Sequence, residues 1–200
     1  MKAAARRPGR PSSGARERVL EAGLEVLKAD GYAGLTTAKV AARSGQNKAL
    51  ISYHFGSKQG LVAAVGHELS EAITDELLGG IEDRRHVEGI VRGAVEGLGR
   101  LMDRDERLAR LYFDLTAVSV VEPEVRKVMS EMKAGWRTLL AEVLGDADDG
   151  PPPKRAESGA VFVLAGLDGL ALERLSTGET RALTAAQTMF VKAAAAALTR

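Results

Sequence analysis

The sequence predicts an all-α protein of about nine helices, and three observations support this. Alanine, leucine, arginine and glutamate are abundant, whereas alternating runs of β-branched residues are scarce. Apolar residues recur at helical spacing, for example at Leu61, Val65, Leu69 and Ile73. Hydrophobic residues make up 45% of the chain and aromatic residues only 4%, so aliphatic side chains must build most of the core.

Residues 1–12 combine basic and small side chains with two prolines, a composition that predicts a flexible arm. Its arginines, Arg6, Arg7 and Arg10, either follow the backbone or minor groove of DNA or belong to a solvated tail. The first helix is expected over residues 13–29, with Gly31 closing it.

Residues 36–58 contain two short predicted helices joined by a tight turn. Thr36 and Asn47 are suited to cap the two helices with their side-chain oxygens. Gly45 stands where a helix end requires the left-handed conformation. This layout is typical of a helix-turn-helix, whose second helix enters the major groove of DNA.

Charge is distributed unevenly along the chain. Residues 1–60 hold 11 Lys/Arg and 4 Asp/Glu, a net +7, whereas residues 61–200 hold 17 and 23, a net −6. A basic head on an acidic body favours a phosphate-binding domain joined to one that does not meet phosphate.

The remaining helices are predicted to form a larger domain. A helix capped by Ser57 should end at Gly79 and Gly80, and others are expected over residues 84–102, 105–119, 123–144, 157–176 and 181–198. Three prolines and a glycine predict a loop over 146–155. The last two helices are apolar around much of their circumference, which favours a partner subunit. The predicted domains are therefore the arm 1–12, a DNA-binding domain 13–56 and a larger helical dimerisation domain 57–200.

The run GLTTAKVAARSGQNKALISYHFGSKQGL, residues 34–61, resembles the DNA-binding signature of the TetR family of bacterial one-component regulators. The matching positions are Thr36, Val40, Ala41, Gly45, Lys48, Ile51, Tyr53, His54, Phe55, Ser57, Lys58 and Leu61. Two positions depart from the family pattern, Gln46 at an apolar turn position and Ser52 where tyrosine is common. Gln46 either alters the turn packing or points to DNA, and Ser52 removes one phosphate contact. The resemblance implies a three-helix headpiece, a homodimer through a four-helix bundle of the last two helices, and a ligand pocket in the body.

DNA binding needs both phosphate contacts and base contacts. The side chains placed for these tasks are Thr36, Thr37, Lys48, Tyr53, His54 and Lys58 toward the backbone, and Gln46, Asn47 and Lys48, assisted by Ser52, toward bases. Three of them also have a structural interpretation: Asn47 as a cap, Tyr53 as packing and Lys58 as solvated charge.

Polar or aromatic residues within the apolar runs of the body are the candidates for a ligand pocket. They are Tyr112, Phe113, Asp114, Trp136, Phe162 and Asp168. Asp168 interrupts the apolar run VFVLAGLDGLAL, so it is expected to bond a ligand, an arginine across the dimer or a local backbone group. Its GLDGLAL context resembles a pattern of the family's C-terminal domains, which favours a structural role. The expected ligand is a small, partly hydrophobic organic molecule.

Several function classes find no support. The chain has no cysteine and its three histidines are not spaced as metal ligands, so no catalytic residue, metal or cofactor is expected. The longest apolar run, residues 160–172, is too short to span a bilayer, and no secretory signal appears, so a soluble, cytoplasmic protein is expected.

These observations favour a homodimeric repressor that a small organic effector releases from a palindromic double-stranded operator. A regulator without an inducer, or an activator, is the nearer alternative. The alternative from another class is a helical small-molecule-binding enzyme or carrier whose headpiece mediates protein contacts.

Overall fold

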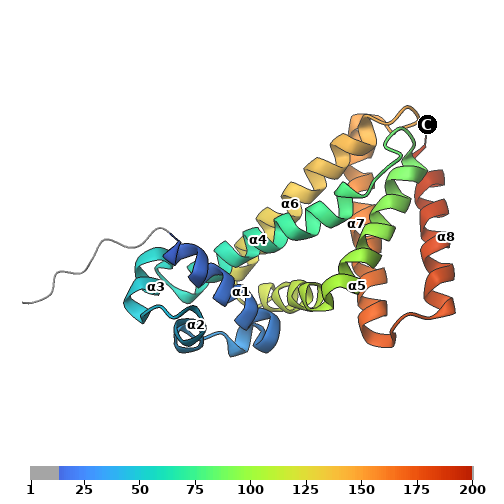
Figure 1. Cartoon of the computed structure of the whole chain (residues 1–200). Helices are drawn as coiled ribbons and strands as arrows, with labels where there is room; N and C mark the ends of the chain where they lie inside the picture. The colour runs from blue at the N-terminus through green and yellow to red at the C-terminus, as the bar shows by residue number, and fades with distance from the viewer. Residues whose placement is uncertain (1–13, 200) are drawn as a thin grey trace, which may run out of the picture. The chain divides into compact units, whose positions relative to one another are not determined.

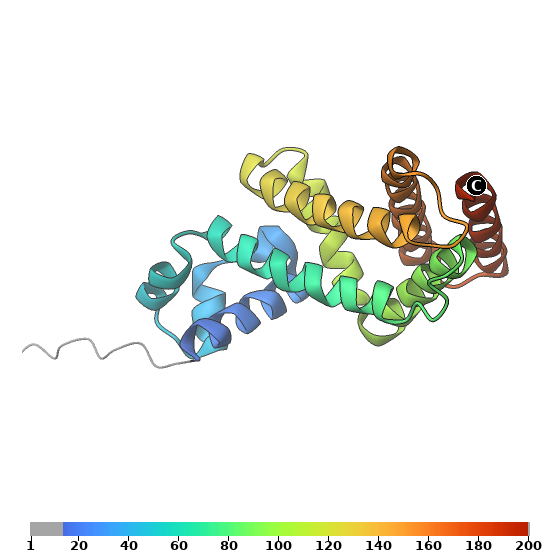
Figure 2. The same cartoon turned by 90° about the horizontal axis from the view of Figure 1, so that it is seen from above.

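The computed structural model describes residues 14–199, which form eight α-helices and no strand, and this confirms the all-α prediction. In chain order the helices are α1 (Ala15–Gly34), α2 (Thr37–Ser44), α3 (Lys48–Phe55), α4 (Lys58–Gly79), α5 (Val87–Ser119), α6 (Pro123–Gly145), α7 (Pro153–Thr177) and α8 (Arg181–Leu198). Figure 1 shows their arrangement, and Figure 2 shows the same helices from above.

The chain divides into two compact units, Met1–Val65 and Gly66–Arg200. The division lies inside α4, so this one helix contributes residues to both units. The domain boundary at 56/57 inferred from the sequence stays a prediction. The proposed arm, with Arg6, Arg7 and Arg10, lies outside the described residues.

The first unit, called the headpiece below, is a small helical core. In it α1 packs against α2 and α3. Val19, Val40 and Ile51 are almost fully buried, and α4 adds Leu61 to them. Gly31, with φ 67° and ψ −177°, interrupts the helical geometry of α1 at the predicted position, and glycine is suited to this positive φ.

The second unit, called the body, contains the rest of α4 and helices α5 to α8. Its core is one apolar cluster in which α5 packs against α6, α7 and α8. A Cβ atom on Gly97 would lie against the backbone of Glu76 and Leu77, and one on Gly93 against Ile81. These two glycines of α5 therefore allow the end of α4 and the residues just after it to approach closely.

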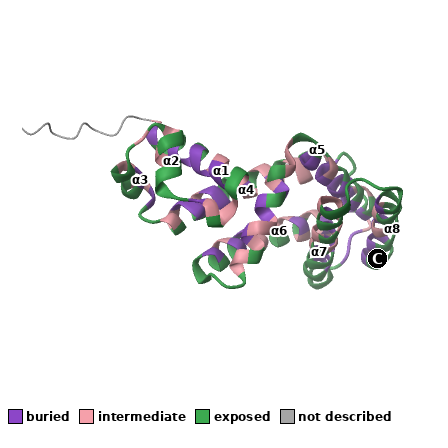
Figure 3. Cartoon of the chain, turned by 90° about the horizontal axis from the view of Figure 1, so that it is seen from below, coloured by how far each residue is buried: buried purple, intermediate pink, exposed green. Residues whose placement is uncertain are grey.

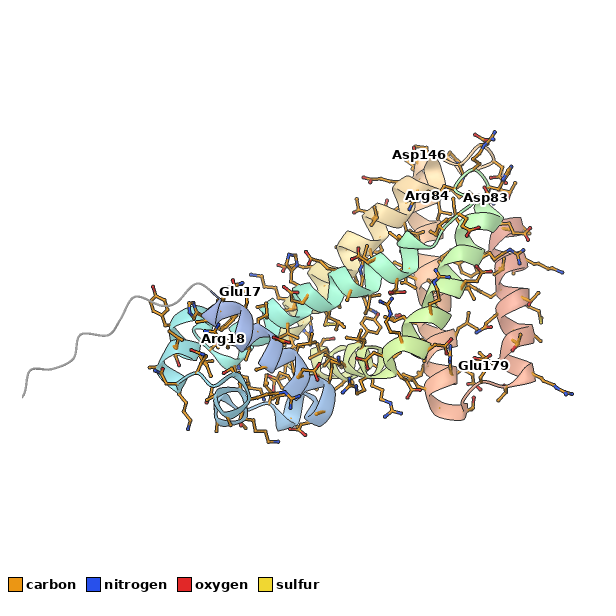
Figure 4. All side chains as sticks on the ribbon, viewed as in Figure 1. Glu17, Arg18, Asp83, Arg84, Asp146 and Glu179 are labelled. Carbon is orange, nitrogen blue, oxygen red and sulfur yellow. The ribbon has the colours of Figure 1, made fainter. Side chains whose placement is uncertain are left out.

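The two ends of the body are tied by polar contacts. At one end, Figure 4 labels Asp83 and Arg84 in the α4–α5 connection and Asp146 in the α6–α7 connection. These connections are joined because the amide of Val87 donates to Asp149 at 2.9 Å. At the other end, where Figure 4 labels Glu179, the guanidinium of Arg174 contacts that carboxylate at 3.4 Å.

The helix boundaries differ most from the sequence prediction at two places in the body. The helices expected over 84–102 and 105–119 form a single element, α5, which is why eight helices are found in the described residues. Asp105 is non-helical inside it (φ −153°, ψ 84°), and its carboxylate accepts from the amide of Arg107 at 3.2 Å. The loop predicted over 146–155 is also too long, because α7 begins at Pro153. A proline in the first helical turn needs no intrahelical donor.

Candidate DNA-binding surface and ligand cavity

The helix-turn-helix is held by the caps that the sequence predicts. Thr36 Oγ1 accepts from the amide of Lys39 at 3.2 Å, and Asn47 Oδ1 accepts from the amide of Leu50 at 2.8 Å. Between the two helices Gly45 adopts the left-handed conformation with φ 66°. Most residues in the first turns of α2 and α3 are exposed, and the amides of such a helix start are suited to bind an anion. Thr37, the first residue of α2, is exposed beside them.

The inner and outer faces of α3 are sharply different. Ile51 and Phe55 are buried and anchor the helix to the headpiece core. Lys48, Ser52 and Tyr53 are exposed, and 73% of the Tyr53 surface is accessible although tyrosine is a large aromatic residue. A helix anchored on one side with polar side chains free on the other is able to enter a DNA groove.

Three predicted contact residues point back toward the protein. Gln46 is half-buried in the turn, and its side-chain amide donates to the Ser44 carbonyl at 3.4 Å. His54 is half-buried, with its ring 5.1 Å from Tyr53 and 6.3 Å from Phe55. Its buried Nε2 has no hydrogen-bond partner among the described residues.

Lys58 is the third of these residues. Its Nζ donates to the Tyr32 carbonyl at 2.8 Å and lies 4.1 Å from the centre of the Tyr32 ring. The Lys58 charge therefore bridges the start of α4 and the end of α1.

The body contains a small, partly open cavity of about 40 Å³ between α4, α5, α6 and α7. Its walls are mainly aliphatic, with three aromatic rings and one carboxylate. The lining residues are Ile73, Leu77, Leu98, Leu101, Ala109, Tyr112, Phe113, Trp136, Leu164, Leu167, Asp168 and Ala171. A larger open groove of about 890 Å³ lies between α6 and α7, with walls that include several alanines and prolines and no aromatic ring.

The polar corner of the cavity is a cluster of three side chains from three helices. The Tyr112 hydroxyl donates to the Asp168 carboxylate, 3.0 Å from each oxygen, and Lys133 Nζ donates to Asp168 Oδ2 at 3.2 Å. Burial, and after it the negative charge of Asp168, raises the pKa of Tyr112 to about 12. Burial alone would lower the pKa of Lys133, but its interactions with Tyr112 and Asp168 outweigh this and raise the pKa.

Four of the six predicted pocket residues, Tyr112, Phe113, Trp136 and Asp168, line this cavity, and the other two do not. Phe162 lies on the exposed face of α7, 46% accessible, with its ring 5.9 Å from that of Phe190. A helical rotation of about 200° separates it from Leu164, which faces the cavity. Asp114 is half-buried on α5 but does not line the cavity either.

The sequence reasoning missed two residues of the cavity region. Lys133 pairs with Asp168, and Thr74 Oγ1 accepts from the indole N–H of Trp136 at 2.9 Å. A signal for Lys133 was present, because it stands beside Met132 and three residues before Trp136 on a helix with a buried apolar stripe. Asp168 thus has an intramolecular partner that none of the three expected alternatives included.

The described part of the chain contains neither a metal-binding group nor a membrane-spanning helix. No group of three or more potential metal-ligating side chains is close enough to hold an ion there. None of the described helices is long and apolar enough to cross a membrane.

Comparison with known families decides the class of protein. Residues 19–65 match the profile of bacterial regulatory proteins of the tetR family, and residues 88–199, more than half of the chain, match that of the BetI-type transcriptional repressor C-terminal domain. The chain belongs to the TetR family. TetR-family proteins are DNA-binding transcription regulators and not enzymes, so the enzyme alternative is excluded.

Individual relatives are distant but similar in fold. The HTH-type transcriptional regulator BetI 1 of Chromohalobacter salexigens is 24% identical over 160 residues, which cover 78% of this chain and 76% of that protein. A transcriptional regulator from Rhodococcus sp. Rha1 superposes with a TM-score of 0.75 at 22% identity, covering 92% of this chain and 97% of the other. The multidrug binding protein EbrR, complexed with ethidium, has a TM-score of 0.70 at 23% identity and covers 89% of this chain and 97% of its own. These TetR-fold neighbours carry the same architecture as this chain.

Proposed function

We propose that this TetR-family regulator is a cytoplasmic homodimeric repressor, released from a palindromic operator when a small organic effector binds in the body. The observation that carries the proposal is the outer face of α3. Lys48, Ser52 and Tyr53 are exposed there on a helix whose opposite face is fixed in the headpiece core. The net charge of +7 over residues 1–60 supports a polyanionic partner for this face.

Lys48 and Ser52 are the residues we assign to base reading, with Tyr53 and the exposed start of α2 at Thr36 and Thr37 on the phosphates. Lysine is able to reach guanine, and hydroxyl groups serve either base or phosphate. Asn47 caps α3 with its side-chain oxygen, and we assign its amide N–H₂ group to a base. Gln46, His54 and Lys58 act by positioning these residues, because each of the three contacts the protein itself.

Apolar side chains exposed along α7 and α8 support the homodimer. Val161, Phe162 and Leu172 on α7 and Met189 on α8 are between 46% and 71% accessible. The exposed faces of both helices are visible in Figure 3. Large apolar side chains in such a row are typical of a protein interface, and two helices from each chain would form a four-helix bundle. The dimer would place two α3 helices in successive major grooves, about one helical turn of DNA apart.

The small cavity between α4, α5, α6 and α7 is the proposed effector site, because it combines apolar walls with a few convergent polar groups. The aromatic ligand of the structurally similar EbrR supports an effector with an apolar body. Ile73 and Leu77 of α4 line the cavity, while Leu61 and Val65 of the same helix belong to the headpiece. We therefore propose α4 as the element through which the effector changes operator affinity. Leu69→Ala in α4 should alter the effector response more than headpiece binding to DNA, and equal effects on both would contradict this role.

The proposal is tested by binding of the purified protein to its own upstream DNA and to a scrambled duplex, at two salt concentrations. Tight binding to the upstream DNA alone, weakening steeply with salt and lost in Lys48→Ala/Tyr53→Ala, is the expected result. Equal weak binding to both duplexes would require selection of the operator from random DNA. Absence of binding to any duplex in such a selection, at low salt, would contradict the proposal.

A further inference from the structure

The cavity in the body offers a ligand one charge among apolar and aromatic groups. Asp168 is the single charged residue among those that line it, and the rings of Tyr112, Phe113 and Trp136 lie on the same walls. The Tyr112 ring centre is 5.1 Å from that of Phe113 and 5.6 Å from that of Trp136. A carboxylate beside grouped aromatic rings is an environment that attracts a cation.

An ammonium group of the protein already occupies the polar corner. Lys133 Nζ is 3.2 Å from Asp168 Oδ2 and 5.4 Å from the centre of the Tyr112 ring. Lys133 is not among the lining residues, and 36% of its side chain is accessible to solvent. The ammonium therefore reaches the carboxylate from the outer side of the cavity and has a path back to water.

We propose that Lys133 is a tethered occupant of a cation subsite, and that the effector is an organic cation whose charged group displaces the Lys133 ammonium at Asp168 and Tyr112. This inference rests on the proposed function, because it names the chemical class of the proposed effector and the residue that determines it.

An anionic effector fits these contacts poorly. Its charge would meet the Asp168 carboxylate that lines the cavity, while Lys133, the one cation of the cluster, is already paired with that carboxylate. An incoming cation would replace a half-exposed ion pair, which is weak, by a contact with the same carboxylate together with the aromatic rings.

The cavity is too small to hold an organic effector without a change in the structure around it. A volume of about 40 Å³ is far below the several hundred Å³ that an organic ligand fills. Binding must therefore move side chains of α5, α6 and α7 apart as Lys133 withdraws. Lys133→Met keeps the apolar stem of the side chain and removes the competing ammonium.

The test is calorimetry on the full-length, DNA-free protein with three probes of similar size: the phenethylammonium cation, the hydrocinnamate anion and neutral hydrocinnamyl alcohol. Trp136, the only tryptophan of the chain, reports by fluorescence whether a probe enters the cavity. The matched control is Lys127→Met, which removes an exposed lysine of the same helix.

We expect Lys133→Met to bind the cation about tenfold more tightly than the wild type or Lys127→Met, with a change in Trp136 fluorescence. Asp168→Asn should weaken cation binding at least tenfold, and Asp168→Glu should keep part of the wild-type affinity. The affinity for hydrocinnamyl alcohol should be the same in all variants. Thermal melts of each variant identify any that fails to fold.

The proposal is overturned if Lys133→Met and Lys127→Met bind the cation equally, if neither binds it, or if the wild type prefers the anion and loses it in Lys133→Met. Operator binding is measured on the same preparations without effector. Because operator binding depends on the headpiece, a protein that binds its operator but fails the cation test contradicts only the effector proposal and not the regulator proposal.

Discussion

The headpiece and the body have opposite distributions of polar and apolar side chains. In the headpiece the apolar residues of α3 are buried and the polar ones, with Tyr53, face outward. In the body Tyr112, Lys133 and Asp168 face one another, while Phe162 and Met189 are exposed. Each unit thus leaves uncovered the kind of surface that its proposed partner would cover: phosphate and bases for the headpiece, a second apolar helix pair for the body.

The largest expected effect comes from placing a charge on the apolar face of the body. Phe162→Glu should convert the dimer to a monomer, because a carboxylate would be buried in the proposed four-helix bundle. Operator affinity should fall about 100-fold or more, since the two half-sites would then be bound independently. Light scattering gives the mass and titration gives the affinity. Ser130→Glu, at an exposed position of α6, is the matched control, and a dimeric Phe162→Glu would refute this assignment of the face.

Removing the outward side chains of α3 should have the next largest effect. Lys48→Ala and Tyr53→Ala should each weaken operator binding by about 10- to 100-fold and leave the dimer intact. Lys48→Ala should also change either base preference or the salt slope, depending on whether the ammonium meets a base or a phosphate. Gln59→Ala, an exposed residue of the first turn of α4, is the control. Wild-type affinity in both α3 variants would show that DNA does not meet this face.

The buried Tyr112 of the polar cluster should cause a pH dependence of stability. The pKa of Tyr112 is raised from 10.0 to about 12, so the folded protein holds this proton more tightly than the unfolded chain. The contribution to stability is complete below pH 10 and is lost as pH rises through 12, a fall of about 2 kcal/mol. Urea unfolding at several pH values should show this fall in the wild type and not in Tyr112→Phe. If the free energy of unfolding depended on pH equally in both proteins, Tyr112 would not be buried as described.

The smallest expected effect concerns Lys58. Unlike the outward-facing polar residues of α3, this headpiece side chain contacts the protein itself. Because its ammonium donates to the Tyr32 carbonyl, Lys58→Met should lower the stability of the headpiece by about 1 kcal/mol. The salt slope of DNA binding should stay unchanged. A slope reduced by about one unit would instead identify Lys58 as a phosphate contact, as the family resemblance implies.

Much of the headpiece could be predicted from the sequence because its signals are local. Thr36 and Asn47 each bond an amide three residues away, and Gly45 has its unusual φ regardless of the rest of the fold. Helix periodicity likewise predicted the all-α class. The break at Asp105 was also local, but whether it separates two helices or lies within one depends on the surrounding packing.

The candidate effector site was less predictable because its contacts connect distant parts of the chain. Asp168 meets Tyr112 and Lys133, which are 56 and 35 residues away, and no spacing rule relates three helices that far apart. The position of Phe162 was also not predictable. The sequence pattern of an aromatic residue in an apolar helix is the same whether the side chain faces a cavity or a partner subunit. Lys58 could only be placed once the end of α1 was known to approach α4.

The most direct test of the proposed dimeric DNA-binding regulator is to measure, by light scattering, the mass of the wild-type protein bound to a duplex that carries its operator. One complex requires both uncovered surfaces at once, the α3 face on DNA and the α7–α8 face on a second chain. We expect two chains for each duplex, with the same two chains remaining together when salt releases the DNA. One chain for each duplex, or a monomer after release, would contradict it.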